Sequence, residues 1–270
     1  MPDSNERTGS PEVAFGWLPD LPDHRDLPYG AMRLSLEAPL ALPRKVDLRN
    51  VQFPIYDQDR LGSCTANAIG AALEYDRIRQ GLPDFRPSRL FIYYLERAME
   101  GTVNRDSGAF IRDGIKVVAQ NGFPHEDTWP YDISKFAEQP PQSAFDDATK
   151  YLAVSYFRLD NTSINELKSC LAAGFPFVFG FTVYTSFFSA NTNGGIVPMP
   201  GNEKVEGGHA VLAVGYDDDT ERFAIRNSWS ANRGDQGYYY MPYQYLNNAQ
   251  LSADFWTIRT VTQATIAGAF

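Results

Sequence analysis

Hydrophobic and polar positions change their period near residue 150, which divides the chain into two unlike halves. From Val46 to about Ala144, apolar residues recur at the three- and four-residue spacing of amphipathic helices. The pattern predicts three helices in this half, namely one that Ser63 caps and that ends before Gly81, one over "SRLFIYYLERAME" and one over "FIRDGIKVVAQNG".

The second half favours strands, because it is rich in Val, Phe and Tyr with Gly, Asp and Asn between the runs. Six segments read as strands: "YLAVSYFRL", "FPFVFGFTVY", "GHAVLAVGYD", "RFAIRNSW", "GYYYMPY" and "DFWTIRTV". One helix over "TSINELKSCLAAG" interrupts them, and Ser163 with Glu166 predicts a capping box at its start. We therefore expect an α+β fold, with a helical lobe over about 45–145, an antiparallel β lobe over about 146–262 and a cleft between them.

The first 44 residues follow neither period and are rich in proline, which predicts an extended segment laid over the folded body. A disordered tail is the alternative. Six large apolar residues favour packing over disorder: Phe15, Trp17, Leu18, Leu21, Leu27 and Tyr29. Residues 263–270 are expected to form a C-terminal tail.

Charge excludes some classes of partner. The net charge of −9 argues against nucleic acid or an anionic membrane, because phosphate binding needs clustered Lys and Arg. The start "MPDSNERTGSPEV" lacks the apolar core of a signal peptide, and with two cysteines it suggests the cytoplasm. A removed signal or non-classical export remains open. Neither a metal nor another cofactor is expected, because the histidines and cysteines lack zinc spacing and "DDDTE" reads as a solvated hairpin tip.

Three residues suggest nucleophilic chemistry. Cys64, in "YDQDRLGSCTANAIG", opens a predicted helix, whose positive end favours a thiolate. His209 begins a predicted strand after two glycines, where it can face a cleft. Asn227 ends another strand and could fix the tautomer of an imidazole. Taken singly, Cys64 is more commonly a small buried cysteine and Asn227 a turn residue, and His209 is as often a satisfied structural histidine as a functional one.

The order and spacing of the three are more specific. His209 lies 145 positions after Cys64, and Asn227 follows 18 positions later. With "KVDLRN", "DTWPY", "NGGIV" and "RNSW…GDQGYYY" in the same order, the chain from Lys45 onward resembles the papain-like cysteine peptidase family. The resemblance implies a two-lobe fold with a barrel-like β lobe.

The resemblance also implies catalytic roles. Cys64 would be the nucleophile and His209 the general base and later acid. Asn227 would orient the imidazole, and Trp229 would shield that hydrogen bond. Gln58, six residues before the cysteine, would donate its side-chain amide to the oxyanion, although alone it could equally be a surface residue.

On the substrate side, Gly108 would pair with the substrate backbone, and Gly180 and Gly208 would line the specificity pocket. Plain backbone roles for these glycines remain open. Near "NAQLSADFW", where the pocket floor would lie, no charged residue stands out. Substrate preference is therefore not predicted.

Several positions depart from the family. Leu61 replaces a usual cysteine and Cys170 has no evident partner, so the usual disulfides are expected to be absent. Thr65, Ser230 and Arg233 also differ from the common pattern. The segment before Lys45 resembles the short N-terminal segment of bacterial papain-like peptidases of the xylellain type, and we hypothesise that it restrains activity.

The expected function is that of a cysteine-type endopeptidase that forms a thioester acyl-enzyme on peptide or protein substrates, with its own N-terminal segment as inhibitor. One alternative is other acyl transfer on the same site, by a transpeptidase, deamidase or esterase. A catalytically idle peptide-binding homologue is the other.

Overall fold

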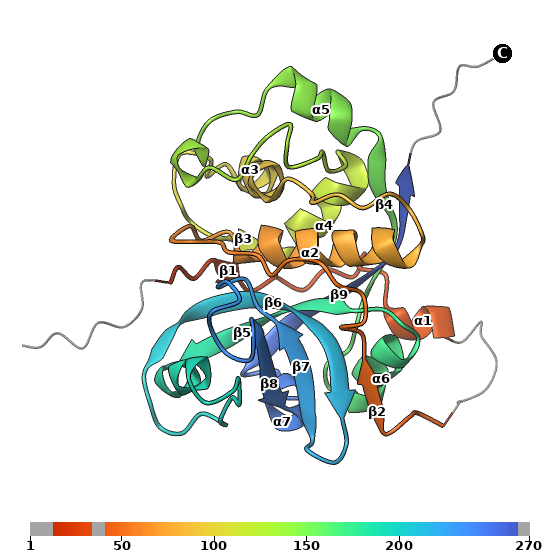
Figure 1. Cartoon of the computed structure of the whole chain (residues 1–270), viewed down its shortest axis with the longest axis vertical. Helices are drawn as coiled ribbons and strands as arrows, with labels where there is room; N and C mark the ends of the chain where they lie inside the picture. Colours follow the sequence, from red (N-terminus) through yellow and green to blue (C-terminus); the bar gives the residue numbers. More distant parts are fainter. Residues whose placement is uncertain (1–12, 34–40, 264–270) are drawn as a thin grey trace, which may run out of the picture.

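The computed structural model describes residues 13–33 and 41–263. Helices α3, α4 and α5 lie on one side of α2, and most of a large sheet lies on the other (Figure 1). The helical side contains α2 (Cys64–Arg79), α3 (Arg89–Glu100), α4 (Ile111–Gln120) and α5 (Gln142–Ala148). The predicted α+β architecture of two lobes is confirmed.

The sheet has the order β4-β9-β5-β6-β7-β8, and β2 pairs with β6 outside this path. Its strands are β2 (Lys45–Asp47), β4 (Tyr151–Arg158), β5 (Phe177–Tyr184), β6 (Val205–Asp217), β7 (Arg222–Arg226), β8 (Tyr238–Pro242) and β9 (Ser252–Gln263). All these pairs are antiparallel. In place of the expected barrel-like lobe, the strands of the described residues form an open sheet. Lys45–Asp47 joins this sheet and not the helical lobe.

The predicted helices are present, but two of their predicted caps are not. Ser88 caps α3 by accepting from the Phe91 amide at 3.3 Å. Ser63 precedes α2 without capping it, and Ser163 likewise makes no cap bond at α6 (Ile164–Ala172). The prediction of a capping box was wrong, because the Glu166 side chain accepts from the Asp160 amide at 2.8 Å instead. The remaining helix of the sheet side is α7 (Tyr243–Leu246).

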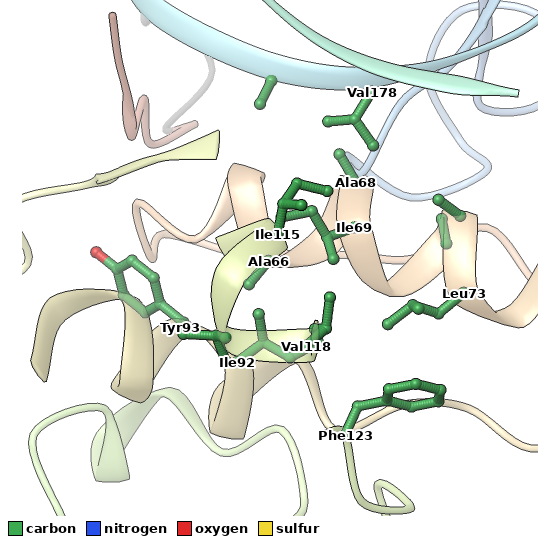
Figure 2. Packing of buried hydrophobic residues seen from close by; sticks show 14 of the residues in the cluster. Ala66, Ala68, Ile69, Leu73, Ile92, Tyr93, Ile115, Val118, Phe123 and Val178 are labelled. Carbon is green, nitrogen blue, oxygen red and sulfur yellow. The ribbon is translucent and has the colours of Figure 1, made fainter. Parts of the chain in front are cut away.

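Helix α2 supplies the core that both lobes share. Fourteen of its residues are buried, because α3 and α4 cover one side and the sheet covers the other. Figure 2 shows Ile69 and Leu73 among the side chains of the helical lobe, whereas Ala68 lies toward Val178 of β5. The small Ala and Gly residues of α2 let the sheet approach closely, and this contact fixes the first residue of α2 against β6.

The described part of the N-terminal segment, residues 13–33, runs between the lobes (Figure 1). It contains β1 (Trp17–Leu18) and α1 (Tyr29–Arg33), and β1 pairs in parallel with β3 (Ala109–Phe110). Trp17 and Tyr29 are buried, as predicted, but Leu21 and Leu27 are exposed. Residues 1–12, 34–40 and 264–270, which include parts of the expected segment and tail, lie outside the described residues.

Within residues 13–33 and 41–263, no helix is long and apolar enough to span a membrane. No three His, Cys, Asp or Glu side chains in this part of the chain group so as to hold a metal ion. Asp217 ends β6, and residues 218–221 form the turn to β7, as predicted for this stretch.

Because α2 is the shared core, truncating its buried face should destabilise the whole chain. Ile69 is fully buried, and Ile69→Ala should lower the free energy of unfolding by about 2–5 kcal/mol. Val154→Ala, on a half-exposed strand residue, is the control and should cost about 1 kcal/mol or less. Denaturant titration measures both; equal losses would contradict this role of α2.

Candidate active site

Cys64 is the first residue of α2, and its side chain is fully buried. Burial raises the pKa of the thiol to about 12, and hydrogen bonds from the backbone of Ala210 and Gly16 offset part of this rise. Ala210 directly follows His209 on β6. The sulfur therefore lies beside the strand that carries the histidine.

His209 is held in one orientation. Its Nε2 lies 2.8 Å from Oδ1 of Asn227, the residue that follows β7. The Ser228 amide donates to the same oxygen at 2.8 Å, so this atom is an acceptor and Nε2 carries the proton. Burial lowers the pKa of His209 to about 4, against a smaller opposite effect of the Asn227 hydrogen bond. In the neutral ring, Nδ1 is then the free base.

The indole of Trp229 covers this pair. Its ring stacks on the imidazole, with centroids 4.5 Å apart and planes inclined by 25°. Among the described residues, Nδ1 of His209 has no hydrogen-bond partner. The imidazole is thus shielded on one face and bonded at one nitrogen, while its other nitrogen is available for proton transfer.

The side-chain amide of Gln58 is equally fixed. Its Oε1 accepts from the Ser228 hydroxyl at 2.7 Å, and its Nε2 donates to the Leu61 carbonyl at 3.0 Å. The Tyr131 hydroxyl donates to the Gln58 carbonyl at 2.9 Å. Ser228 and Tyr131 were not assigned roles from the sequence, although both lie in the quoted motifs "RNSW" and "DTWPY".

The N-terminal segment passes directly over these groups. Nε2 of Gln58 donates to the Ala14 carbonyl at 3.2 Å. The Gly16 amide donates to the Gly208 carbonyl at 3.1 Å, and the Ala109 amide donates to the Gly16 carbonyl at 2.7 Å. Phe15 lies against both His209 and Trp229, with ring centroids 6.4 and 6.3 Å away.

Each of the three predicted substrate-side glycines contacts the segment. A Cβ added at Gly108 would lie 2.2 Å from the Gly16 carbonyl oxygen. At Gly180 and Gly208 it would lie 2.0 and 2.4 Å from atoms of Trp17. The glycines therefore line a groove that the segment fills. Contrary to the sequence-based expectation, a charged residue of "NAQLSADFW", Asp254, also reaches this groove through Trp17.

The departures from the family pattern leave these groups in place. Both cysteines are free, as predicted, and Cys170 is buried. Thr65, which replaces an aromatic residue, donates to Glu96 at 2.8 Å inside the helical lobe. Thr65 thus contributes to the packing behind Cys64.

A buried thiol at a helix N-terminus, an imidazole oriented by an amide and a fixed side-chain N–H donor define the class of cysteine hydrolases. The family model described as "Papain family cysteine protease" matches residues 42–257. The chain belongs to this family, and it is a cysteine endopeptidase.

Relatives agree with this assignment. Xylellain, a cysteine protease from Xylella fastidiosa, is 46% identical, with a TM-score of 0.84 over 92% of this chain and 97% of its own. An uncharacterized peptidase C1-like protein of Acanthamoeba polyphaga mimivirus is 40% identical over 93% of this chain and 88% of its own length. A cathepsin B-like protein of Giardia intestinalis is 29% identical over 80% and 73%.

The fixed amide of Gln58 generates a test of oxyanion stabilisation. Gln58→Ala should lower kcat by roughly 10²–10³, the usual cost of one oxyanion donor, without loss of the fold. Ser228→Ala should lower kcat less, because it only frees the Gln58 side chain to turn. Peptide hydrolysis and circular dichroism measure the two effects; full turnover in Gln58→Ala would contradict this assignment.

Proposed function

We propose that the enzyme hydrolyses peptide bonds through Cys64, His209, Asn227 and Gln58, and that its own N-terminal segment holds it closed until displaced. The observation that carries the proposal is the occupied groove. Backbone groups of residues 14–16 form hydrogen bonds with the Gln58 side-chain amide, the Gly208 carbonyl and the Ala109 amide at the same time. A substrate needs the same groups, so segment and substrate exclude one another.

In the open enzyme, Nδ1 of His209 takes the proton of the Cys64 thiol, and the sulfur attacks the carbonyl carbon of the substrate. The developing oxyanion accepts hydrogen bonds from Nε2 of Gln58 and the backbone N–H of Cys64. His209 returns its proton to the leaving amine, which departs as the C–N bond breaks. Water, deprotonated by His209, then hydrolyses the thioester and regenerates the thiol. Asn227 keeps the imidazole aimed throughout.

In the closed form the same pair is held neutral. Burial raises the thiol pKa and lowers the imidazole pKa, so both shifts oppose the thiolate–imidazolium pair. Water that enters when the segment leaves removes the cause of both shifts. The segment therefore restrains the enzyme by occupying the groove and by keeping the nucleophile protonated.

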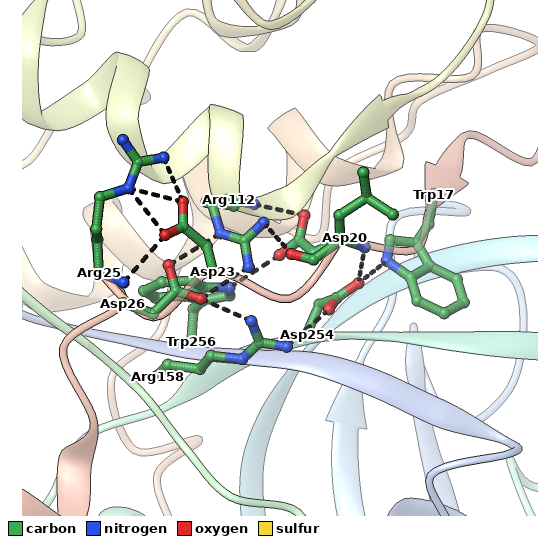
Figure 3. Close-up of polar contacts among 10 residues, drawn as sticks. Trp17, Asp20, Asp23, Arg25, Asp26, Arg112, Arg158, Asp254 and Trp256 are labelled. Carbon is green, nitrogen blue, oxygen red and sulfur yellow. Dashed lines mark hydrogen bonds and ion pairs between the residues drawn. The ribbon is translucent and has the colours of Figure 1, made fainter.

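An ion-pair cluster fastens the segment to both lobes. Asp26 bonds Arg112 of α4 at 2.7 Å and Arg158 of β4 at 2.6 Å (Figure 3). The Asp26 and Arg112 side chains are about nine-tenths buried, so water screens their ion pair less than it would at the surface. One carboxylate thereby joins the segment to the helical lobe and to the sheet.

Gly16 offers a point test of the restraint. A Cβ there would lie 1.7 Å from the Gly62 carbonyl oxygen, next to the start of α2. Gly16→Ala should therefore displace the segment and raise the rate of peptide hydrolysis by the full chain at least tenfold. Gly30→Ala is the matched control, because its Cβ meets only an ordinary contact at 3.5 Å. Equal rates for wild type and Gly16→Ala would exclude the inhibitory role.

A second test uses pH. Burial, followed by the charge of Asp254, raises the pKa of Asp20 to about 7 in the docked segment. The Asp254 pKa is also raised, chiefly by burial. Docking therefore takes up a proton, which stabilises the closed form in acid, and this contribution is lost as the pH rises through about 7. Asp26 responds oppositely. Burial raises its pKa, but hydrogen bonds from Arg112 and Arg158 outweigh this effect and lower the pKa overall. The stabilisation that Asp26 gives to the docked segment is therefore lost only in stronger acid.

The expected result is a rate for wild type, relative to Asp20→Asn, that rises from pH 5 to 7 and then levels. A rise of at most tenfold per pH unit corresponds to one proton. The ratio cancels the titration of Cys64 and His209, which both proteins share. A ratio that stays constant over pH 5 to 8 would contradict the carboxylate pair as the cause.

A further inference from the structure

The indole of Trp17 fills a pocket built on three neighbouring strands. Gly180 of β5 forms its floor, because the missing side chain leaves room for the ring to lie on the sheet. Gly208 of β6 forms one wall, and β9 the other, since β5 pairs with both strands. Trp17 is only 7% exposed, so the pocket accommodates a whole large side chain.

A carboxylate stands at the end of this pocket. Oδ2 of Asp254 accepts from Nε1 of Trp17 at 3.0 Å, and the side chain is only 3% exposed. Figure 3 shows the indole pointing at this carboxylate. The pocket therefore has glycines against the ring and a carboxylate at its end.

The backbone conformation at Asp254 directs its side chain into the pocket. Its φ is +60°, a left-handed conformation that is uncommon for residues other than glycine. The pairing of β9 with β5 shifts register between Val178 and Gly180, so Asp254 lies in a β-bulge. Bulges beside active sites turn a side chain that regular pairing would point elsewhere, and their strain persists where the surrounding structure enforces it.

When the segment leaves, Asp254 loses most of its donors. The Trp17 indole and the Asp20 amide, which donates at 2.8 Å, both bind Oδ2 and both belong to the segment. Arg158 remains, but it contacts the other oxygen, Oδ1, at 3.3 Å. Oδ2 thus faces the vacated pocket without a protein donor. A substrate side chain that buries this oxygen again without donating a hydrogen bond leaves a costly unpaired acceptor.

We infer that Asp254 determines substrate specificity: the pocket vacated by Trp17 selects a substrate side chain with N–H donors at its end, arginine above all. The arginine stem would replace the indole on Gly180, and the guanidinium would take over the bonds at Oδ2. An aliphatic side chain such as leucine would fill the pocket but leave the carboxylate unpaired. The inference rests on the proposed function in one respect, that the segment and the substrate share the groove.

Burial raises the pKa of Asp254 in the closed form. The same segment causes much of this burial, so its departure returns the carboxyl toward its ordinary, ionised range. An ionised carboxylate binds guanidinium by charge-assisted hydrogen bonds, which are stronger than those between neutral groups.

The test is a comparison of peptides in the full chain. A positional-scanning library identifies the substrate position with side-chain selectivity, and three peptides then carry Arg, citrulline or Leu at that position. Wild type should cleave the Arg peptide with a kcat/KM at least tenfold above those of the other two. Citrulline keeps the shape of arginine without its charge. This comparison therefore tests the role of charge in the wild-type protein and does not depend on whether a variant folds.

Asp254→Asn should reduce the Arg-to-Leu ratio to about one, and Asn tolerates a positive φ. Asp20→Asn is the matched control: it removes a carboxylate from the segment but not from the pocket, so the ratio should stay at the wild-type value. The fraction of closed enzyme cancels in the Arg-to-Leu ratio of kcat/KM, because both peptides are measured on the same protein. Failure of the inhibitory role would therefore change only the absolute rates. A wild-type ratio near one, or a ratio that Asp254→Asn leaves unchanged, would overturn the inference.

Discussion

The structure depends on one packing contact, that of helix α2 between two unlike lobes. Because small residues line α2, the sheet approaches it closely enough for the backbone of β6 to reach the sulfur of Cys64. Cys64 belongs to one lobe and His209 to the other. Their alignment is therefore set by the core itself, and the groove at the lobe junction follows from the same contact.

In the proposed mechanism, that junction accounts for both the activity and its restraint. A groove open to substrate backbone is also open to the chain's own backbone, and the N-terminal segment uses the same donors and acceptors. Ion pairs of Asp26 with both lobes and the seat of Trp17 on Gly180 hold it there. In the proposed mechanism, the buried pair then remains a neutral thiol and imidazole, so the catalytic residues stay assembled but inactive.

The sequence predicts the fold because its hydrophobic period changes near residue 150, and it predicts Cys64, His209 and Asn227 because their order and spacing are specific. It does not predict Ser228 as the support of Gln58, since that hydrogen bond depends on how two distant segments meet. The sequence does not predict that Asp254 faces the groove, because a bulge with positive φ breaks the alternation from which the direction of strand side chains is deduced. The predicted capping box at Ser163 is absent, because Glu166 accepts from the amide of Asp160 instead.

The most direct measurement of the central claim is the alkylation rate of Cys64 at pH 7, in full-length protein with Cys170→Ala so that one thiol remains. The account predicts slow alkylation when the segment is docked and at least about tenfold faster alkylation when Gly16→Ala displaces it. The gain should disappear when His209→Ala is added, because the imidazolium partner of the thiolate is then absent. Equal alkylation rates with the segment docked and displaced would contradict the account.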